Sequence, residues 1–241
     1  MARLSRVPLA ELQAGERLLD AKTARYLVDI LRLRAGDTFL AFDSQARVEA
    51  DATLGAGNRC VLGEVRAAAR AVATGIVLVQ ALGKGDKTEQ VVRSATALGA
   101  AEVHLVDSAR SVARAGERSD AKRSRLESIA LDAARQCGRG DVPTIVGPHP
   151  LSRELATWRE VTALKLCLVP GATRSLRSLT ETWSVGSPIA LLVGPEGGLA
   201  EEELAAAEAA GFIAVSFGEL VLRTEIAGVA ALGALLLLAQ R

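Results

Sequence analysis

The stretch that decides the fold spans Pro188–Ile226 and reads PIALLVGPEGGLAEEELAAAEAAGFIAVSFGELVLRTEI. Its opening run, Ile189–Val193, is apolar throughout and predicts a buried strand. A glycine-rich loop begins at Gly194, and glycines let a ligand approach the main chain closely. A helix is expected from about Ala200, because Glu201–Glu203 then lie in its first turn and complement the helix dipole. This order is typical of a ligand-binding turn, although a plain strand-to-helix connection has the same pattern.

The charges around this loop indicate the kind of ligand that it suits. A glycine loop that leads into a helix N-terminus often binds phosphate. Here Glu201–Glu203 stand where a phosphate would lie, and the loop contains no Gly-Lys-Ser/Thr sequence. We therefore expect a neutral or cationic ligand.

The second half of the stretch adds three polar residues in apolar surroundings. Ile213–Ser216 predicts another strand, and Arg223-Thr224-Glu225 follows just ahead of a very apolar helix. Burying an unpaired charge is costly, so we expect Arg223 and Glu225 to be paired or to contact a ligand.

These motifs resemble the C-terminal core of the SPOUT-type RNA methyltransferases. Within them the chain is most similar to the family that methylates N3 of a uridine in small-subunit 16S ribosomal RNA. The resemblance rests on LLVGPEGGLAEEEL, AGF and LVLRTE, and it extends upstream to Ala81–Val112 and Asp132–Pro143. It implies an α/β fold with a parallel sheet, a deep trefoil knot, and a pocket for S-adenosylmethionine, with S-adenosylhomocysteine as the product.

Two domains are expected, residues 1–70 and 74–241. In the first, a helix over Thr23–Leu33 and strands near residues 38–42, 47–54 and 59–65 suggest a small β-rich barrel. The resemblance implies that this barrel is a PUA-like RNA-binding domain. In the second, strand 76–82, helix 87–98 and strand 102–106 indicate a parallel α/β sheet. An Asp86–Glu89 capping pattern begins that helix.

Further along, the pattern predicts a helix over about 120–137, a short strand at 142–145, a helix at 152–158 and a strand at 164–169. Residues 172–187 are polar and are expected to be mobile.

Composition sets limits on partners. The net charge is +1, so an RNA surface must be a local patch, and aromatic residues make up only 3%, which disfavours base stacking as the main recognition device. An odd number of distant cysteines fits a reducing cytoplasm, and His104 and His149 alone predict no metal site. The apolar segment 226–239 is too short to span a membrane, so we expect no membrane partner. The resemblance implies a homodimer through this segment, which could equally be monomer core.

The candidate RNA-binding residues are scattered basic side chains, which are often no more than solvated surface. Basic residues outnumber acidic ones between positions 110 and 139, and the N-terminal arginines form a possible phosphate-contacting face. The early helix has Ala24 or Arg25 where the family usually has a histidine. The candidates are Arg3, Arg6, Arg25, Arg32, Arg34, Arg110, Gln136 and Arg139.

The resemblance also implies the cofactor and catalytic residues. Methyl transfer is an in-line displacement, so the enzyme mainly positions donor and acceptor. Uracil N3 must lose its proton; Arg223 would steady the uracil oxygens, and Glu196 or Glu225 would be the base or a cofactor contact. The expected cofactor-binding residues are Leu168, Val169, Pro170, Gly171, Leu192, Gly194, Pro195, Glu196, Gly197, Gly198, Leu220, Val221, Leu222 and Thr224.

Two alternatives remain open. One is ribose 2′-O methylation by the same superfamily, against which the Lys84–Leu98 and Ala133–Pro143 matches argue. The other is a non-catalytic RNA-binding protein, which would bind no S-adenosylmethionine.

Overall fold

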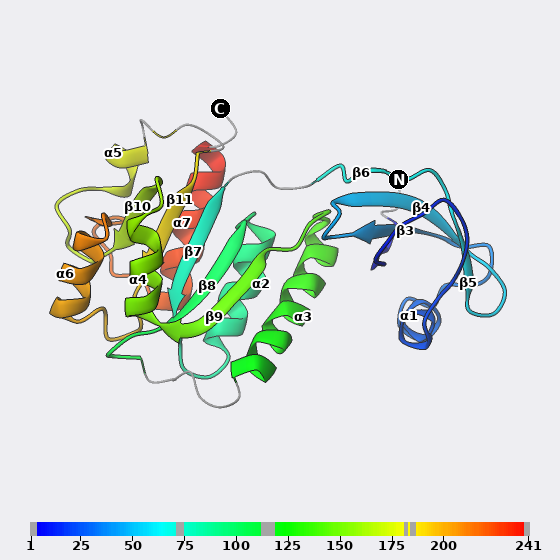
Figure 1. Cartoon of the computed structure of the whole chain (residues 1–241), viewed down its shortest axis with the longest axis horizontal. Helices are drawn as coiled ribbons and strands as arrows, with labels where there is room; N and C mark the ends of the chain where they lie inside the picture. Colours follow the sequence, from blue (N-terminus) through cyan, green and yellow to red (C-terminus); the bar gives the residue numbers. More distant parts are fainter. Residues whose placement is uncertain (1–3, 71–74, 112–118, 181–182, 184–186, 239–241) are drawn as a thin grey trace. The chain divides into compact units, whose positions relative to one another are not determined.

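The computed structural model describes residues 4–70, 75–111, 119–180, 183 and 187–238. The chain divides into two compact units, one of residues 1–72 and 134–142 and the other of residues 73–133 and 143–241 (Figure 1). Residues 134–142 therefore pack with the N-terminal unit, although they lie far from it in the sequence.

The first unit is built on a mainly antiparallel sheet with the strand order β1-β3-β4-β5-β2, and β6 pairs with β4. Only β1 and β3 pair in parallel. The strands are β1 Arg6–Pro8, β2 Gly15–Leu18, β3 Thr38–Asp43, β4 Val48–Leu54, β5 Arg59–Leu62 and β6 Arg66–Ala67. Alternate residues of β4 and β5 are buried, as expected for strands with one face on a core.

The predicted helix over Thr23–Leu33 is wrong in its bounds and in part of its type. Helix α1 covers Ala21–Arg25 and continues as a π-helix, η1, over Tyr26–Ile30. Asp20 starts α1 by accepting hydrogen bonds from the backbone N–H groups of Lys22 and Thr23. The helix does not reach Leu33 because Arg32 has a φ of 57°, in the left-handed region.

The second unit contains a parallel sheet with the order β12-β10-β11-β7-β8-β9. The strands are β7 Ile76–Ala81, β8 Glu102–Asp107, β9 Thr144–Pro150, β10 Leu164–Leu168, β11 Ile189–Val193 and β12 Ile213–Val215. Both β7 and β11 are buried at every residue, which explains their nearly continuous apolar sequences and confirms the predicted strands.

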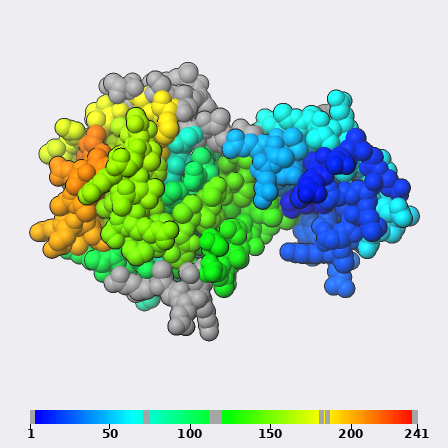
Figure 2. Space-filling model, viewed as in Figure 1, coloured from blue at the N-terminus to red at the C-terminus, as the bar shows by residue number. Residues whose placement is uncertain are grey.

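Helices cover both faces of this sheet (Figure 1). They are α2 Lys87–Ala97, α3 Ser119–Cys137, α4 Leu151–Arg159, α5 Leu176–Thr180, α6 Glu201–Ala209 and α7 Thr224–Leu238. Helices α2 and α7 pack together and α7 lies against β7 and β11, whereas α4 contacts β8, β9 and α6. Figure 2 shows α4 and α6 side by side on one face of this unit.

Three local predictions differ from the structure. Asp86 does not cap α2, because its carboxylate accepts a hydrogen bond from the Gln90 side chain instead. The strand expected from residue 142 begins at Thr144 and runs to Pro150. Part of the segment 172–187, expected to be mobile, forms α5. Among the described residues, no helix is long and apolar enough to cross a bilayer.

Candidate functional site

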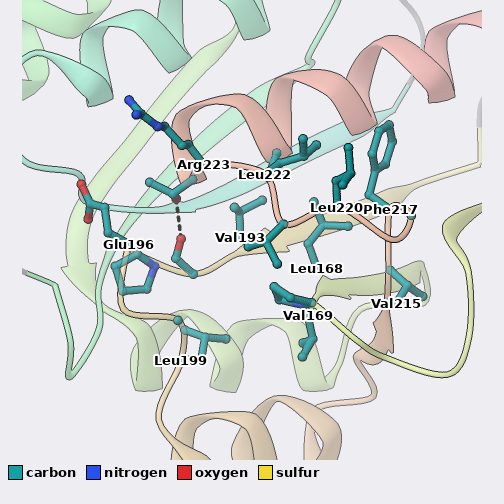
Figure 3. A pocket seen from close by; sticks show the side chains of 18 of the residues that line it. Leu168, Val169, Val193, Glu196, Leu199, Val215, Phe217, Leu220, Leu222 and Arg223 are labelled. Carbon is teal, nitrogen blue, oxygen red and sulfur yellow. Dashed lines mark hydrogen bonds between the residues drawn. The ribbon is translucent and has the colours of Figure 1, made fainter.

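A pocket lies at the carboxyl ends of β10, β11 and β12, where ligands bind in open parallel sheets. Its cavity measures about 480 Å³, within the usual range for small-molecule sites. Leu168, Val193 and Val215 form an apolar floor from the three strand ends. In Figure 3, Glu196 and Arg223 lie at one end of the pocket and Phe217 at the other.

The loop after β11 has a shape that favours glycine at two positions. A Cβ at Gly194 would lie 3.1 Å from both the backbone nitrogen and the Cγ of Leu199, closer than neighbouring atoms normally allow. Gly198 has a φ of 69° and donates its N–H to the carbonyl of Pro195, which closes a tight turn. The loop Gly194–Leu199 is therefore compact, and it forms one wall of the pocket.

Side chains from distant elements hold this loop. Arg110, after β8, donates from Nη1 to the carbonyl oxygens of Gly197 (3.0 Å) and Leu199 (3.4 Å). The hydroxyl of Thr224, the first residue of α7, donates to the carbonyl oxygen of Gly194 at 2.5 Å. The loop is thus fixed from both ends.

An acidic pair at one end of the pocket shares one ammonium group. Lys87 Nζ lies 3.0 Å from Glu196 Oε1 and 3.4 Å from Glu225 Oε2. The hydrogen bond with Glu196 raises the pKa of Lys87. Burial pushes the pKa of Glu196 upward, but hydrogen bonds from its own backbone N–H and from Lys87 outweigh burial and hold this pKa below its usual value. Both partners therefore stay charged near neutral pH.

Of the two polar residues expected to be paired or to contact a ligand, Glu225 is paired and Arg223, within the described ranges, is not. Glu225 faces Lys87, and the guanidinium of Arg223 is exposed with no ion pair among the described residues. In Figure 3 it points away from the apolar floor. Because no protein carboxylate occupies it, the guanidinium is available to an external ligand.

Known proteins resemble this chain both in sequence and in fold. The family described as "RNA methyltransferase domain" matches residues 71–236. The chain belongs to this family.

Individual relatives match over nearly the whole chain. "Ribosomal RNA small subunit methyltransferase E" of Mycobacterium bovis is 32% identical over 93% of this chain and 87% of its own length. The protein of the same name from Bacillus subtilis is 27% identical over 90% of this chain and 88% of its own length.

Solved structures with the same fold carry a cofactor. A methyltransferase of Legionella pneumophila, in complex with the cofactor SAM, has a TM-score of 0.87 and 28% identity, and the match covers 97% of both chains. The small subunit methyltransferase E of Neisseria gonorrhoeae, bound to S-adenosyl methionine, has a TM-score of 0.86 and 26% identity, and the match covers 98% of both chains.

Most of the residues expected to bind the cofactor line this one pocket of the RNA methyltransferase. They are Leu168, Val169, Pro170, Gly194, Pro195, Glu196, Gly198, Leu220, Val221, Leu222 and Thr224. The catalytic candidates Arg223 and Glu196 line it too, and Glu225 joins them through Lys87.

Three expected cofactor residues do not line the pocket. Leu192 packs in the core against the α4 side of the sheet, because neighbouring strand residues point to opposite faces and Val193 takes the pocket side. Gly197 turns its carbonyl to Arg110. Gly171 lies in the turn after β10 with a φ of 77°.

The glutamates at the start of α6 do not set the charge of the pocket, contrary to the argument from sequence. None of Glu201–Glu203 lines it. Glu203 instead accepts hydrogen bonds from the backbone N–H groups of Ala200 (2.9 Å) and Ala109 (2.7 Å). The carboxylates at this end of the pocket are those of Glu196 and Glu225, which both pair with Lys87.

The RNA candidates separate into buried and exposed side chains. Arg6 is buried and paired with Glu49, and Arg139 is buried with two hydrogen bonds to Asp141, so neither presents a free charge to a phosphate. Arg110 holds the glycine loop, as described above. The exposed candidates are Arg25, Arg32, Arg34 and Gln136, and Arg3 lies outside the described residues.

Sequence reasoning missed Lys87 and several apolar or small residues of the pocket, which are Val193, Leu199, Leu204, Val215, Phe217, Gly218 and Ala227. Lys87 was visible as the first residue of a helix inside a matching motif, but nothing in its spacing linked it to Glu196, which lies 109 positions away.

Proposed function

We propose that the chain transfers a methyl group from S-adenosylmethionine to N3 of a specific uridine in 16S ribosomal RNA. The observation that carries this proposal is the match to small subunit methyltransferase E over nearly the whole length of both chains, by sequence and by structure. The cytoplasm, where ribosomal RNA is modified, is the compartment that we assign to it.

The pocket fits the proposed cofactor. A cavity of about 480 Å³ with an apolar floor suits an adenosine group. When bound, S-adenosylmethionine supplies an electrophilic methyl group on a sulfonium. Leu168, Val193 and Leu222 would contact its apolar surface and exclude water from it.

Arg223 is the residue that we assign to the acceptor. The N3 proton of uracil must leave before N3 can attack, and a guanidinium near the ring oxygens stabilises the resulting anion and lowers its pKa. Arg223 lines the pocket, is exposed, and forms no ion pair with a carboxylate in the part of the chain that the structure describes.

Of the two acidic candidates, we assign the role of base to Glu225. The pKa of Glu196 is held below its usual value, which weakens it as a proton acceptor. Glu225 Oε2 is buried and makes no hydrogen bond within the described residues, although Lys87 lies nearby. We therefore propose that Glu225 accepts the N3 proton of uracil and that Glu196 helps to hold the loop.

The finer features of the fold belong to the same proposal. We infer a trefoil knot in residues 74–241 and a PUA-like domain in residues 1–70, because the family carries both. Arg25, Arg32 and Arg34 are exposed on the N-terminal unit and would contact phosphates there, where Arg6 cannot.

A homodimer is also proposed. Ile226 and Leu237 on α7 are 48% and 69% exposed, and Leu220 and Val221 just ahead of α7 are 82% and 75% exposed. Apolar side chains gathered in this way favour burial against a second copy of the chain.

The test of the function is in vitro methylation of small subunits and of naked 16S RNA, followed by mass spectrometry of the nucleosides. The proposal expects 3-methyluridine. A ribose-methylated nucleoside would favour the 2′-O alternative, and failure to bind S-adenosylmethionine by calorimetry would favour a non-catalytic RNA-binding protein.

A further inference from the structure

Gln80 is a polar residue on the otherwise apolar strand β7, directly behind the pocket. It is 2% exposed, and burial of an amide is costly unless the amide is hydrogen-bonded. Its Nε2 donates to the carbonyl of Ala81 at 3.2 Å and to the hydroxyl of Thr224 at 3.0 Å. Thr224 lines the pocket, whereas Gln80 does not.

The Thr224 hydroxyl has a single proton, and this determines which group donates in each of its two hydrogen bonds. Thr224 Oγ1 donates that proton to the carbonyl of Gly194 (dashed line in Figure 3), so it can only accept from Gln80. An amide NH₂ can donate to it, and a carboxylate cannot. The three residues therefore form a hydrogen-bond relay, in which Gln80 donates to Thr224 and Thr224 donates to Gly194. The first bond joins residues 144 positions apart and the second joins residues 30 positions apart.

Helix α7 is shaped to admit the Gln80 side chain. A Cβ at Gly228, one turn after Thr224, would lie 3.2 Å from Gln80 Oε1 and 3.1 Å from Leu78 Cδ1. Glycine at this position lets the first turn of α7 come close enough to β7 for the hydrogen bond to Thr224.

We propose that Gln80 is a positioning residue for the cofactor pocket. By donating to Thr224 it directs that hydroxyl onto the Gly194 carbonyl, and so holds the loop Gly194–Leu199 in its binding shape. The identity of the ligand, S-adenosylmethionine, rests on the proposed function; the relay rests on the hydrogen bonds alone.

The variant that tests the relay is Gln80→Glu, which keeps the size of the side chain. A protonated glutamic acid can donate to Thr224, whereas an ionised one would compete for the proton that Gly194 needs. Relative to the wild type, the Kd for S-adenosylmethionine should therefore rise as pH increases, by about tenfold or more at the alkaline end, and recover at low pH. Gln80→Met, which cannot donate at all, should bind weakly at every pH.

Substitutions at Thr224 test the second step. Thr224→Val removes the hydroxyl and should weaken binding without this pH dependence, whereas Thr224→Ser keeps the hydroxyl and should bind like the wild type. Adding Gln80→Glu to Thr224→Val should weaken binding no further, because the relay is already broken.

Two results would overturn the proposal: a Gln80→Glu variant with the wild-type pH profile, or additive losses in the double variant. If the wild type itself does not bind S-adenosylmethionine, the proposed function fails, but the relay is still tested without cofactor. Backbone amides of residues 196–199 should then exchange hydrogen faster in Gln80→Met than in the wild type, and equal rates would reject the relay.

Discussion

Lys87 forms ion pairs with both acidic residues at the end of the pocket. It lies on α2, and its ammonium stands between the glycine loop, through Glu196, and α7, through Glu225. With Lys87 present, two negative charges near the ligand share one positive charge. Without it, the two carboxylates would repel each other and the loop would lose an anchor.

The substitution Lys87→Met should raise the KM for S-adenosylmethionine severalfold, because the loop is released. Lys87→Arg, which keeps the charge, should stay close to the wild type. Steady-state kinetics with both variants measure this. Equal KM values for Lys87→Met and the wild type would show that the ion pairs do not support the pocket.

The substitution Arg223→Ala should lower kcat by about a hundredfold, the size of effect seen when one electrostatic donor to a developing anion is removed. The fold should be intact, because the side chain is exposed and its guanidinium has no ion pair within the described residues. Methyl-transfer rates and thermal melting measure the two effects. Arg159→Ala, at an exposed arginine on α4, is the matched control, and Arg223→Ala with wild-type turnover would remove Arg223 from the mechanism.

Residue roles were only partly predictable from sequence. Motif order placed Gly194, Arg223 and Thr224 at one pocket, since they lie in or beside the loops that follow β11 and β12, the two strands that flank β10. The alternation of strand residues could have excluded Leu192, but only once the pocket face of β11 was known. The burial of Arg6 and Arg139 depends on Glu49 and Asp141, and no local pattern reveals such pairing.

At the scale of elements, β8, β9 and α4 are joined by a partly buried hydrogen-bond network centred on Glu154. Glu154 of α4 binds His104 Nδ1, His149 Nε2 and Trp158 Nε1, each at 2.6 Å, and His104 Nε2 lies 2.9 Å from Glu102. Burial lowers the pKa of His104, but hydrogen bonds to Glu102 and Glu154 outweigh it and raise that pKa to about 9.

Stability should therefore depend on pH through this network. The folded-state pKa of His104 lies above its unfolded value of 6.5, so its stabilisation is complete below pH 6.5 and is lost as pH rises through about 9. The loss is on the order of 3 kcal/mol at most. Thermal melting from pH 6 to 10 should show this fall in the wild type, and a flatter profile in His104→Gln.

At acidic pH, the stability contributed by this network should change in the opposite direction and fall as pH decreases. Burial raises the pKa of Glu154, but its hydrogen bonds, first with His104, hold the pKa below its usual value of 4.5. Its contribution is present above pH 4.5 and is lost as pH falls further. Wild-type and His104→Gln melting profiles that fall equally between pH 6 and 10 would contradict the role of His104.

Element types were predicted better than their ends. The strands of the parallel sheet are buried on both faces, so their apolar runs stand out in the sequence. Hydrophobic periodicity does not encode the competition between backbone and side-chain hydrogen-bond partners. It therefore predicted neither the π-helical turn η1 nor the hydrogen bond from Gln90 to the Asp86 carboxylate.

At the scale of the whole molecule, a single domain boundary in the sequence does not describe the two units, because the N-terminal unit is made of two separate segments. Residues 134–142 belong to the N-terminal unit because Arg135 stacks on the Tyr26 ring at 4.0 Å and donates to the carbonyl of Arg6. These contacts join positions more than a hundred residues apart, and no feature of the sequence points to them.

A homodimer should depend on the exposed apolar residues of α7. The double substitution Ile226→Glu with Leu237→Glu places charges on that surface and should convert a dimer into a monomer by analytical ultracentrifugation. Leu18→Glu, at a residue of the N-terminal unit that is 69% exposed, is the matched control and should remain dimeric. A wild-type chain that sediments as a monomer would contradict the proposal.

The central claim is that one pocket, built on the carboxyl ends of three parallel strands, delivers a methyl group to the N3 edge of an unpaired uridine. The most direct measurement is the incubation of small subunits with S-adenosylmethionine bearing a labelled methyl group, followed by mass spectrometry of the released nucleosides. We predict labelled 3-methyluridine from the wild type and almost none from Arg223→Ala. Label on a ribose 2′-oxygen, or no label in RNA at all, would contradict the account.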